Sequence, residues 1–204
     1  MTKQNNYFRT IVKIGRALGT TLERDKILQL IVQGALEAMG GKAACLFLMD
    51  EEKGTYVPVA QTGLSKNYVH AGLAHVKKEI PLLLKKGYLH FRDAASDPGV
   101  ENRETKRAEG IASILVVPVR VKGRFIGTLS LYTVKVRDFS AEEIEFLTVL
   151  AEQGGVAVET ARLVERLREN TRIFLDLAAS INSSLDIKDI LQTLSYEVSQ
   201  AIGV

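Results

Sequence analysis

The residues best suited to binding a small molecule gather in the middle of the chain. Aromatic rings offer stacking area, and hydroxyl, imidazole, guanidinium and carboxylate groups offer hydrogen bonds and charge. Long, irregular segments such as residues 64–110 often carry binding sites. Seven residues are candidate ligand contacts here: Tyr68, Tyr88, His90, Arg92, Asp93, Arg103 and Ser113. They predict a polar, partly aromatic pocket, which leaves the identity of any ligand or cofactor open.

Patterns for metal binding or catalysis are missing from the sequence. His70, His75 and His90 do not recur at i and i+4, and no cysteine or carboxylate pair stands beside them at ligand spacing. Cys45, the single cysteine, lies in an apolar run where a small buried residue is expected, which favours a structural thiol over a reactive one. We therefore expect neither a metal site nor enzyme activity.

Composition narrows the class of partner. With 46% hydrophobic and 25% charged residues, the 204-residue chain has the composition of a globular protein. Its net charge of +3 is small. Three basic clusters match no nucleic-acid-binding motif and are predicted to be solvated surface: Lys85-Lys86, Arg103/Lys106/Arg107 and Arg120/Lys122/Arg124. The longest apolar run, residues 111–119, is too short to span a membrane, and the polar start does not resemble a signal peptide. We expect a cytoplasmic protein that contacts neither nucleic acid nor membrane.

The first third of the sequence predicts two helices and a hairpin. Tyr7, Ile11, Ile14 and Leu18 recur at helical spacing and form one apolar stripe on a first helix that ends at Gly19. A second helix follows, to about residue 39. Residues 43–49 and 55–61 are strands joined by a polar turn.

The middle third is less regular and then turns to strands. Residues 64–78 predict a short helix, 80–86 a helical turn, 88–91 a strand and 92–103 a polar loop. Residues 112–120 and 124–133 predict a hairpin. In its second strand Thr128, Ser130 and Tyr132 face away from the apolar side. Such a mixed face fits either the wall of a polar pocket or an ordinary half-buried sheet face.

A long helix ends the chain and leads into a repeat. Ser140 and Glu143 form a capping box at its start. No proline follows, and an apolar three-four spacing runs through Leu163, Leu167 and Phe174. Residues 172–204 resemble residues 9–41, which predicts the entry helices of a second copy of the same domain. Because this stripe and the stripe on the first helix both extend past the predicted domain, we expect them to form a parallel or antiparallel helical bundle in a homodimer.

Part of this pattern resembles the GAF domain family. The segments that carry the resemblance are GIASILVVPV at 110–119, KGRFIGTLSL at 122–131, and Phe139-Ser140 with the helix that follows. The resemblance covers residues 20–168 and implies an α/β (α+β) fold: a central antiparallel sheet of five or six strands between terminal helices and the middle helices and loops, with a long C-terminal signalling helix. It divides the chain into an N-terminal helix at 1–19, a GAF-like sensor domain at 20–168, and a linker helix with the start of a second GAF-like domain at 169–204.

The resemblance also implies a role. GAF domains are small-molecule sensors and dimerisation modules of bacterial signalling proteins. Two functions follow from it: a non-catalytic sensor that binds a small molecule and signals through its terminal helices to a downstream output domain, or a ligand-free structural dimerisation module. Family members that attach a bilin or reduce methionine sulfoxide use cysteines that this chain lacks. The sequence signature of the members that bind cyclic nucleotides is also missing.

Overall fold

The computed structural model describes residues 3–50, 52–66, 68–71 and 73–202. In chain order the elements are α1 (Lys3–Thr20), α2 (Arg24–Met39), β1 (Ala43–Asp50), β2 (Thr55–Thr62), α3 (Leu73–Lys86), β3 (Leu89–Phe91), α4 (Arg103–Ala108), β4 (Ser113–Val121), β5 (Arg124–Thr133) and α5 (Ala141–Ile202). These elements confirm the predicted α+β fold.

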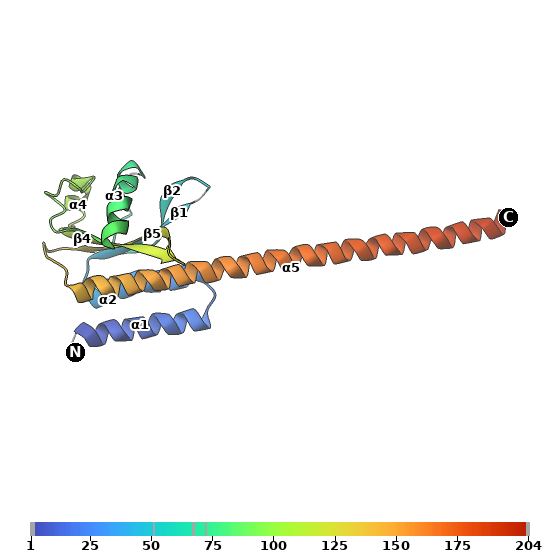
Figure 1. The fold of residues 1–204 in the computed structure, drawn as a ribbon, viewed down its shortest axis with the longest axis horizontal. Coiled ribbons are helices and arrows are strands. Elements are labelled where there is room, and N and C mark those ends of the chain that lie inside the picture. Colours follow the sequence, from blue (N-terminus) through green and yellow to red (C-terminus); the bar gives the residue numbers. More distant parts are fainter. Residues whose placement is uncertain (1–2, 51, 67, 72, 203–204) are drawn as a thin grey trace. The chain divides into compact units, whose positions relative to one another are not determined.

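Five strands form one antiparallel sheet in the order β2-β1-β5-β4-β3 (Figure 1). The central strand β5 pairs with β1 on one side and β4 on the other. Gly127 permits the first pairing, because a Cβ atom there would collide with the carbonyl oxygen of Phe47 on β1. At the other edge, β3 has three residues and pairs only with β4 among the described strands.

The main hydrophobic core lies on the face of the sheet that α2 and the first turns of α5 cover, with α1 packed on the outer side of these helices (Figure 1). Alternate strand residues such as Leu46, Leu115 and Leu129 meet Leu28 of α2 and Leu147 of α5, and all five are fully buried. This packing follows from the two-residue period of a strand, which sends every second side chain to the same face.

The N-terminal helix belongs to this core, which corrects one expectation. The sequence predicts that the apolar stripe of Ile11, Ile14 and Leu18 extends past the domain and is covered by a partner chain. Instead, Ile14 is 1% exposed, Ile11 and Leu18 pack against the same core, and the Tyr7 ring stacks on that of Phe146 with centroids 4.2 Å apart. The stripe on α1 is therefore covered within its own chain.

The segment before β3 also differs from the prediction. The sequence predicts a helix at 64–78 and a separate helical turn at 80–86, whereas a single helix, α3, runs through Pro81, and residues 64–66 and 68–71 are not helical. Proline removes one backbone hydrogen bond and disfavours helical geometry at the preceding residue. Here the helix continues because its other side, which includes the buried Leu83, packs over the sheet.

The chain comprises two compact units, residues 1–161 and 162–204. The second unit is helical throughout its described residues and exposes many apolar side chains, including Leu163, Leu167, Phe174 and Leu177. None of the described helices combines the length and apolarity that a membrane-spanning segment needs.

Candidate functional site

A cavity of about 190 Å³ opens on the face of the sheet opposite the main core. Its floor is made by alternate residues of the strands, among them Phe47, Val116 and Ser130. α3, α4 and the loops before each of them form its roof (Figure 1). The sheet thus separates the main hydrophobic core from this cavity.

The mixed face of β5 lines this cavity. Thr128, Ser130 and Tyr132 point into it, while Leu129 and Leu131 belong to the main core. The alternation predicted from the sequence is therefore present. The sequence left open whether this mixed face is a pocket wall or an ordinary half-buried sheet face, and in the structure it lines the cavity. On β3 the same alternation turns Leu89 and Phe91 toward the cavity.

Aromatic rings dominate the polar end of the cavity. The His70 ring makes edge contacts with the rings of Phe47 and Tyr68, with centroids 4.9 Å away in each case. The Tyr68 ring lies 6.1 Å from that of Tyr132. Burial raises the pKa of both tyrosines, so both keep their hydroxyl protons at neutral pH. These rings offer flat, apolar surfaces with a few polar atoms among them.

Glu109, at the end of α4, holds the loop that carries these rings. Its carboxylate accepts hydrogen bonds from the backbone N–H of Ser65 at 2.9 Å and from the Ser65 hydroxyl at 2.7 Å, and it pairs with Lys42 Nζ at 3.1 Å. The Ser65 hydrogen bonds and then the Lys42 charge lower the Glu109 pKa. Further along the loop, the Asn102 side chain donates to the carbonyl oxygen of His70 at 3.2 Å.

Lys106 on α4 brings a cation into the cavity wall. The residue is only 5% exposed, and its Nζ lies 5.1 Å from the centroid of the Tyr68 ring. It makes no ion pair within the described part of the chain. Burial lowers the Lys106 pKa, while the charge of Glu101 acts in the opposite direction. The prediction that this basic cluster is solvated surface is therefore wrong for Lys106.

His70 contributes a buried polar atom without a partner to the cavity wall. Its Nδ1 is buried and forms no hydrogen bond within the protein. Burial, followed by the positive charge of Lys106, lowers the His70 pKa, so the imidazole is neutral at pH 7. Buried polar atoms in folded proteins are normally hydrogen-bonded. His70 Nδ1 is an exception at this cavity and therefore points to a ligand or water that completes it.

Of the seven predicted contacts, Tyr68 lines the cavity and the other six lie outside its wall. Tyr88 packs against the main core, and Arg92 pairs with Asp138 at 3.3 Å. Asp93 accepts hydrogen bonds within its own turn, from the Ala95 N–H and the Ser96 hydroxyl. Arg103 begins α4 and is exposed.

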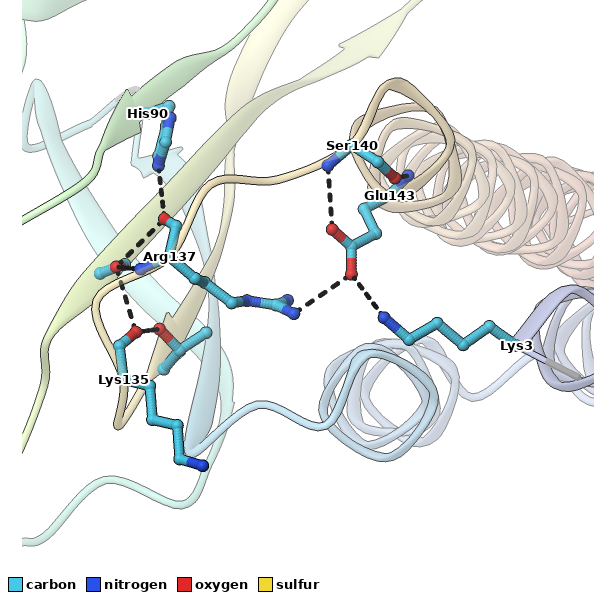
Figure 2. A network of polar contacts seen from close by, with 8 residues as sticks. Lys3, His90, Lys135, Arg137, Ser140 and Glu143 are labelled. Atoms are coloured by element: carbon cyan, nitrogen blue, oxygen red, sulfur yellow. Dashed lines mark hydrogen bonds and ion pairs between the residues drawn. The ribbon is translucent and has the colours of Figure 1, made fainter.

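The remaining two, His90 of β3 and Ser113 of β4, both contact the backbone of Arg137. Figure 2 shows the network that joins His90, Arg137, Glu143 and Lys3. His90 Nε2 lies 3.1 Å from the carbonyl oxygen of Arg137, and Ser113 Oγ accepts from the Arg137 N–H at 2.9 Å. The Arg137 guanidinium donates to the carboxylate of Glu143 at 3.2 Å, and Lys3 of α1 reaches the same carboxylate at 3.5 Å. Glu143 is part of the predicted capping box, which is confirmed: its Oε2 accepts from the Ser140 N–H at 2.9 Å and its N–H donates to Ser140 Oγ at 3.2 Å.

Cys45 lies on β1 and is fully buried. Burial raises its pKa to about 12, so the thiol stays protonated at neutral pH. Within the described residues, no three or more histidine, cysteine, aspartate or glutamate side chains are grouped to hold a metal ion.

Comparisons with known proteins identify the fold. No curated protein sequence matches the chain. Among solved structures, the GAF domain of a phosphoenolpyruvate-protein phosphotransferase from Coxiella burnetii is similar, with a TM-score of 0.66 and 23% identity over 81% of this chain and 99% of that one. The free methionine-R-sulfoxide reductase of Neisseria meningitidis, in complex with its substrate, gives a TM-score of 0.64 and 18% identity over 80% and 95% of the two chains.

A third similar structure is the phycoerythrobilin-bound GAF domain of a cyanobacterial phytochrome, with a TM-score of 0.61 and 15% identity over 81% of this chain and 98% of that one. At these identities the likeness concerns the fold. The family model of the GAF domain matches residues 23–158, more than half of the sequence. The chain therefore belongs to the GAF domain family.

Proposed function

We propose that this protein is a non-catalytic sensory module that binds a small molecule in the cavity between the sheet and α3–α4. The observation that carries the proposal is the cavity of about 190 Å³ whose wall holds the unpartnered Nδ1 of His70 and the side chain of Lys106, a lysine that is 5% exposed. Leaving a buried polar atom such as His70 Nδ1 without a partner is costly, and concave sites with a few convergent polar groups are typical of ligand pockets. The similar phytochrome GAF domain, which binds phycoerythrobilin, supports a sensory role.

The absence of catalysis is part of the proposal. One similar protein is a methionine sulfoxide reductase. Cysteine reactivity requires the thiolate, however, and burial of Cys45 keeps its thiol protonated. We expect ligand binding to shift the protein between two helix arrangements without chemical turnover.

Signal transmission would start at β3. Leu89 and Phe91 of this strand touch the cavity, while His90 between them contacts the Arg137 carbonyl (Figure 2). Arg137 connects in turn to Glu143, the capping residue at the start of α5, which also holds Lys3 of α1. A ligand that moves β3 would therefore act on both terminal helices through one chain of contacts.

We further propose that residues 162–204 mediate homodimerisation and lead to a downstream output domain of a cytoplasmic signalling protein. Leu163, Leu167, Phe174 and Leu177 are 51%, 67%, 71% and 57% exposed and follow the three-four spacing of a helical seam. A second copy of the same helix would bury all four. The resemblance of 172–204 to 9–41 supports a second GAF-like domain after a domain at 20–168.

Light scattering tests the dimer. The wild-type chain should give twice the monomer mass of 22.5 kDa, and Leu167→Glu with Phe174→Glu should give the monomer. The matched control is Leu175→Glu, which makes the same chemical change at an exposed position beside the seam. If all three proteins have the same mass, the seam is not the interface.

The alternative function is a ligand-free structural dimerisation module, because the exposed seam does not depend on the cavity. Mass spectrometry of extracts from the natively purified protein, together with thermal-shift screening of small metabolites, separates the two functions. A stoichiometric small molecule, or a compound that raises the melting temperature of the wild type, supports the sensor. If no compound is recovered and none shifts the melt, the structural module is the better account.

A further inference from the structure

The charged groups of the cavity restrict its ligand. Lys106 is the one lysine or arginine among the described lining residues, and Glu79 and Glu101 also contribute to the wall. Lys106 is nearly fully buried, whereas both glutamates are half-buried. Burying a lysine without an ion pair is unfavourable, and the Tyr68 ring and the charge of Glu101 compensate only in part.

The size and walls of the cavity set a second restriction. A cavity of about 150 Å³ lined by apolar side chains accommodates benzene, and the cavity here measures about 190 Å³. The rings of Phe47, Tyr68 and Tyr132 line it, so a flat apolar body can lie against them. A single six-membered ring with one small polar substituent fits this space.

We propose that the cavity binds a compact organic monoanion, with its carboxylate on the ammonium of Lys106 and its apolar body among Phe47, Tyr68 and Tyr132. This inference rests on the proposed function of the cavity as a ligand site. His70 Nδ1, buried beside the same rings, provides a hydrogen bond to the second carboxylate oxygen when that nitrogen carries the ring proton. The ligand carboxylate would give Lys106 an ion-pair partner and His70 Nδ1 a hydrogen-bond acceptor.

A dianion fits less well. The single ammonium of Lys106 can balance one negative charge, and a second would face the carboxylate of Glu79 without a further cation in the described wall. Like charges brought together in a low-dielectric site repel strongly. The cavity should therefore prefer a carboxylate to a phosphate monoester with the same ring.

The test measures binding of benzoate, benzamide and phenyl phosphate to the full chain by isothermal titration calorimetry and NMR chemical-shift perturbation at pH 7.5. Benzoate and benzamide have nearly the same shape and differ in charge, so their affinity ratio needs no variant. Benzoate should bind at least about tenfold more tightly than benzamide and than phenyl phosphate. In Lys106→Met the preference for benzoate should disappear, whereas it should persist in the matched control Lys85→Met, an exposed lysine of α3.

Each other outcome contradicts a defined part of the inference. If benzamide binds as tightly as benzoate, or Lys106→Met keeps the preference, the cavity binds ligands but does not select anions. Tighter binding of phenyl phosphate would contradict the monoanion. If none of the three compounds binds at about 10 mM, this inference fails; the metabolite screen described above then decides separately whether the cavity binds another small molecule.

Discussion

Replacing Lys106 by methionine should stabilise the ligand-free protein. The substitution keeps the length of the side chain and removes a charge that is 5% exposed and forms no ion pair within the described residues. If the lysine stabilised the fold, its removal would lower the free energy of unfolding. A lysine that serves a ligand reduces the stability of the empty domain, as polar groups at functional sites often do.

The magnitude follows from two opposing effects. Replacing buried ionic groups with apolar side chains of similar volume is neutral or stabilises by about 1–4 kcal/mol. The substitution also removes the cation–π contact between Lys106 and the Tyr68 ring, worth up to about 2 kcal/mol when desolvated. We expect a net stabilisation of about 1–2 kcal/mol, which corresponds to a rise of about 2–8 °C in Tm for a domain of this size.

The pH dependence has a definite sign. Burial lowers the Lys106 pKa below its ordinary value of 10.5. Below the folded-state pKa the lysine is charged in both the folded and unfolded states, so the cost of burial is complete. As the pH rises through that pKa toward 10.5, the folded protein loses the proton first, and its stability increases with pH. The advantage of Lys106→Met should therefore be largest at neutral pH and should shrink as the pH approaches 10.5.

Thermal melts followed by circular dichroism between pH 7 and 10 measure this difference. Lys85→Met serves as the control, because its exposed lysine should change Tm little at any pH. If Lys106→Met lowers Tm at pH 7, the ammonium contributes to folding and the argument from its burial fails. A difference from wild type that stays constant across the pH range would show that the charge is not the cause.

Three further predictions concern the scaffold. Gly127→Ala should destabilise the domain by about 1–3 kcal/mol in urea unfolding, because its Cβ would meet the backbone of the neighbouring strand. The control Gly15→Ala on α1 should be neutral or slightly stabilising, because a Cβ there would meet no atom within 4 Å. Glu143→Gln removes the charge that pairs with Arg137 and Lys3, so it should lower the free energy of unfolding by about 1–3 kcal/mol and speed hydrogen exchange in α1. Unchanged exchange would show that the network does not hold that helix. Cys45 should react with a thiol reagent only after unfolding, and rapid labelling of the native protein would contradict its burial.

The sequence predicted best where a local rule and the tertiary packing agree. The alternation of Thr128, Ser130 and Tyr132 along β5 appears in the structure as the cavity floor, because a strand has a fixed two-residue period. The capping box of Ser140 and Glu143 forms with hydrogen bonds of 2.9 and 3.2 Å, since its two partners lie within one helical turn. Neither feature depends on contacts distant in the sequence.

The site was harder to predict, because nearness in sequence does not determine which face a residue occupies. The sequence predicts Tyr88 and His90 as ligand contacts, yet on the three-residue β3 it is Leu89 and Phe91 that face the cavity. Such a short strand gives no periodic signal from which to choose the face. For Lys106 the sequence predicts solvated surface, because the lysine stands next to Arg107 in a basic cluster. Its burial follows only from the packing of α4 over the sheet.

The position of β3 makes it the part of the sheet best suited to respond to a ligand. It is an edge strand of three residues that pairs only with β4 among the described strands, so moving it disturbs few backbone hydrogen bonds. A ligand can shift an equilibrium only by the difference between its affinities for the two states. Because Leu89 and Phe91 touch the cavity while His90 contacts the Arg137 carbonyl, an arrangement of β3 that closes around the ligand also changes the support of Glu143. We infer that a ligand in the cavity acts on the terminal helices through this short strand, because β3 contacts both the cavity and the network that holds Glu143.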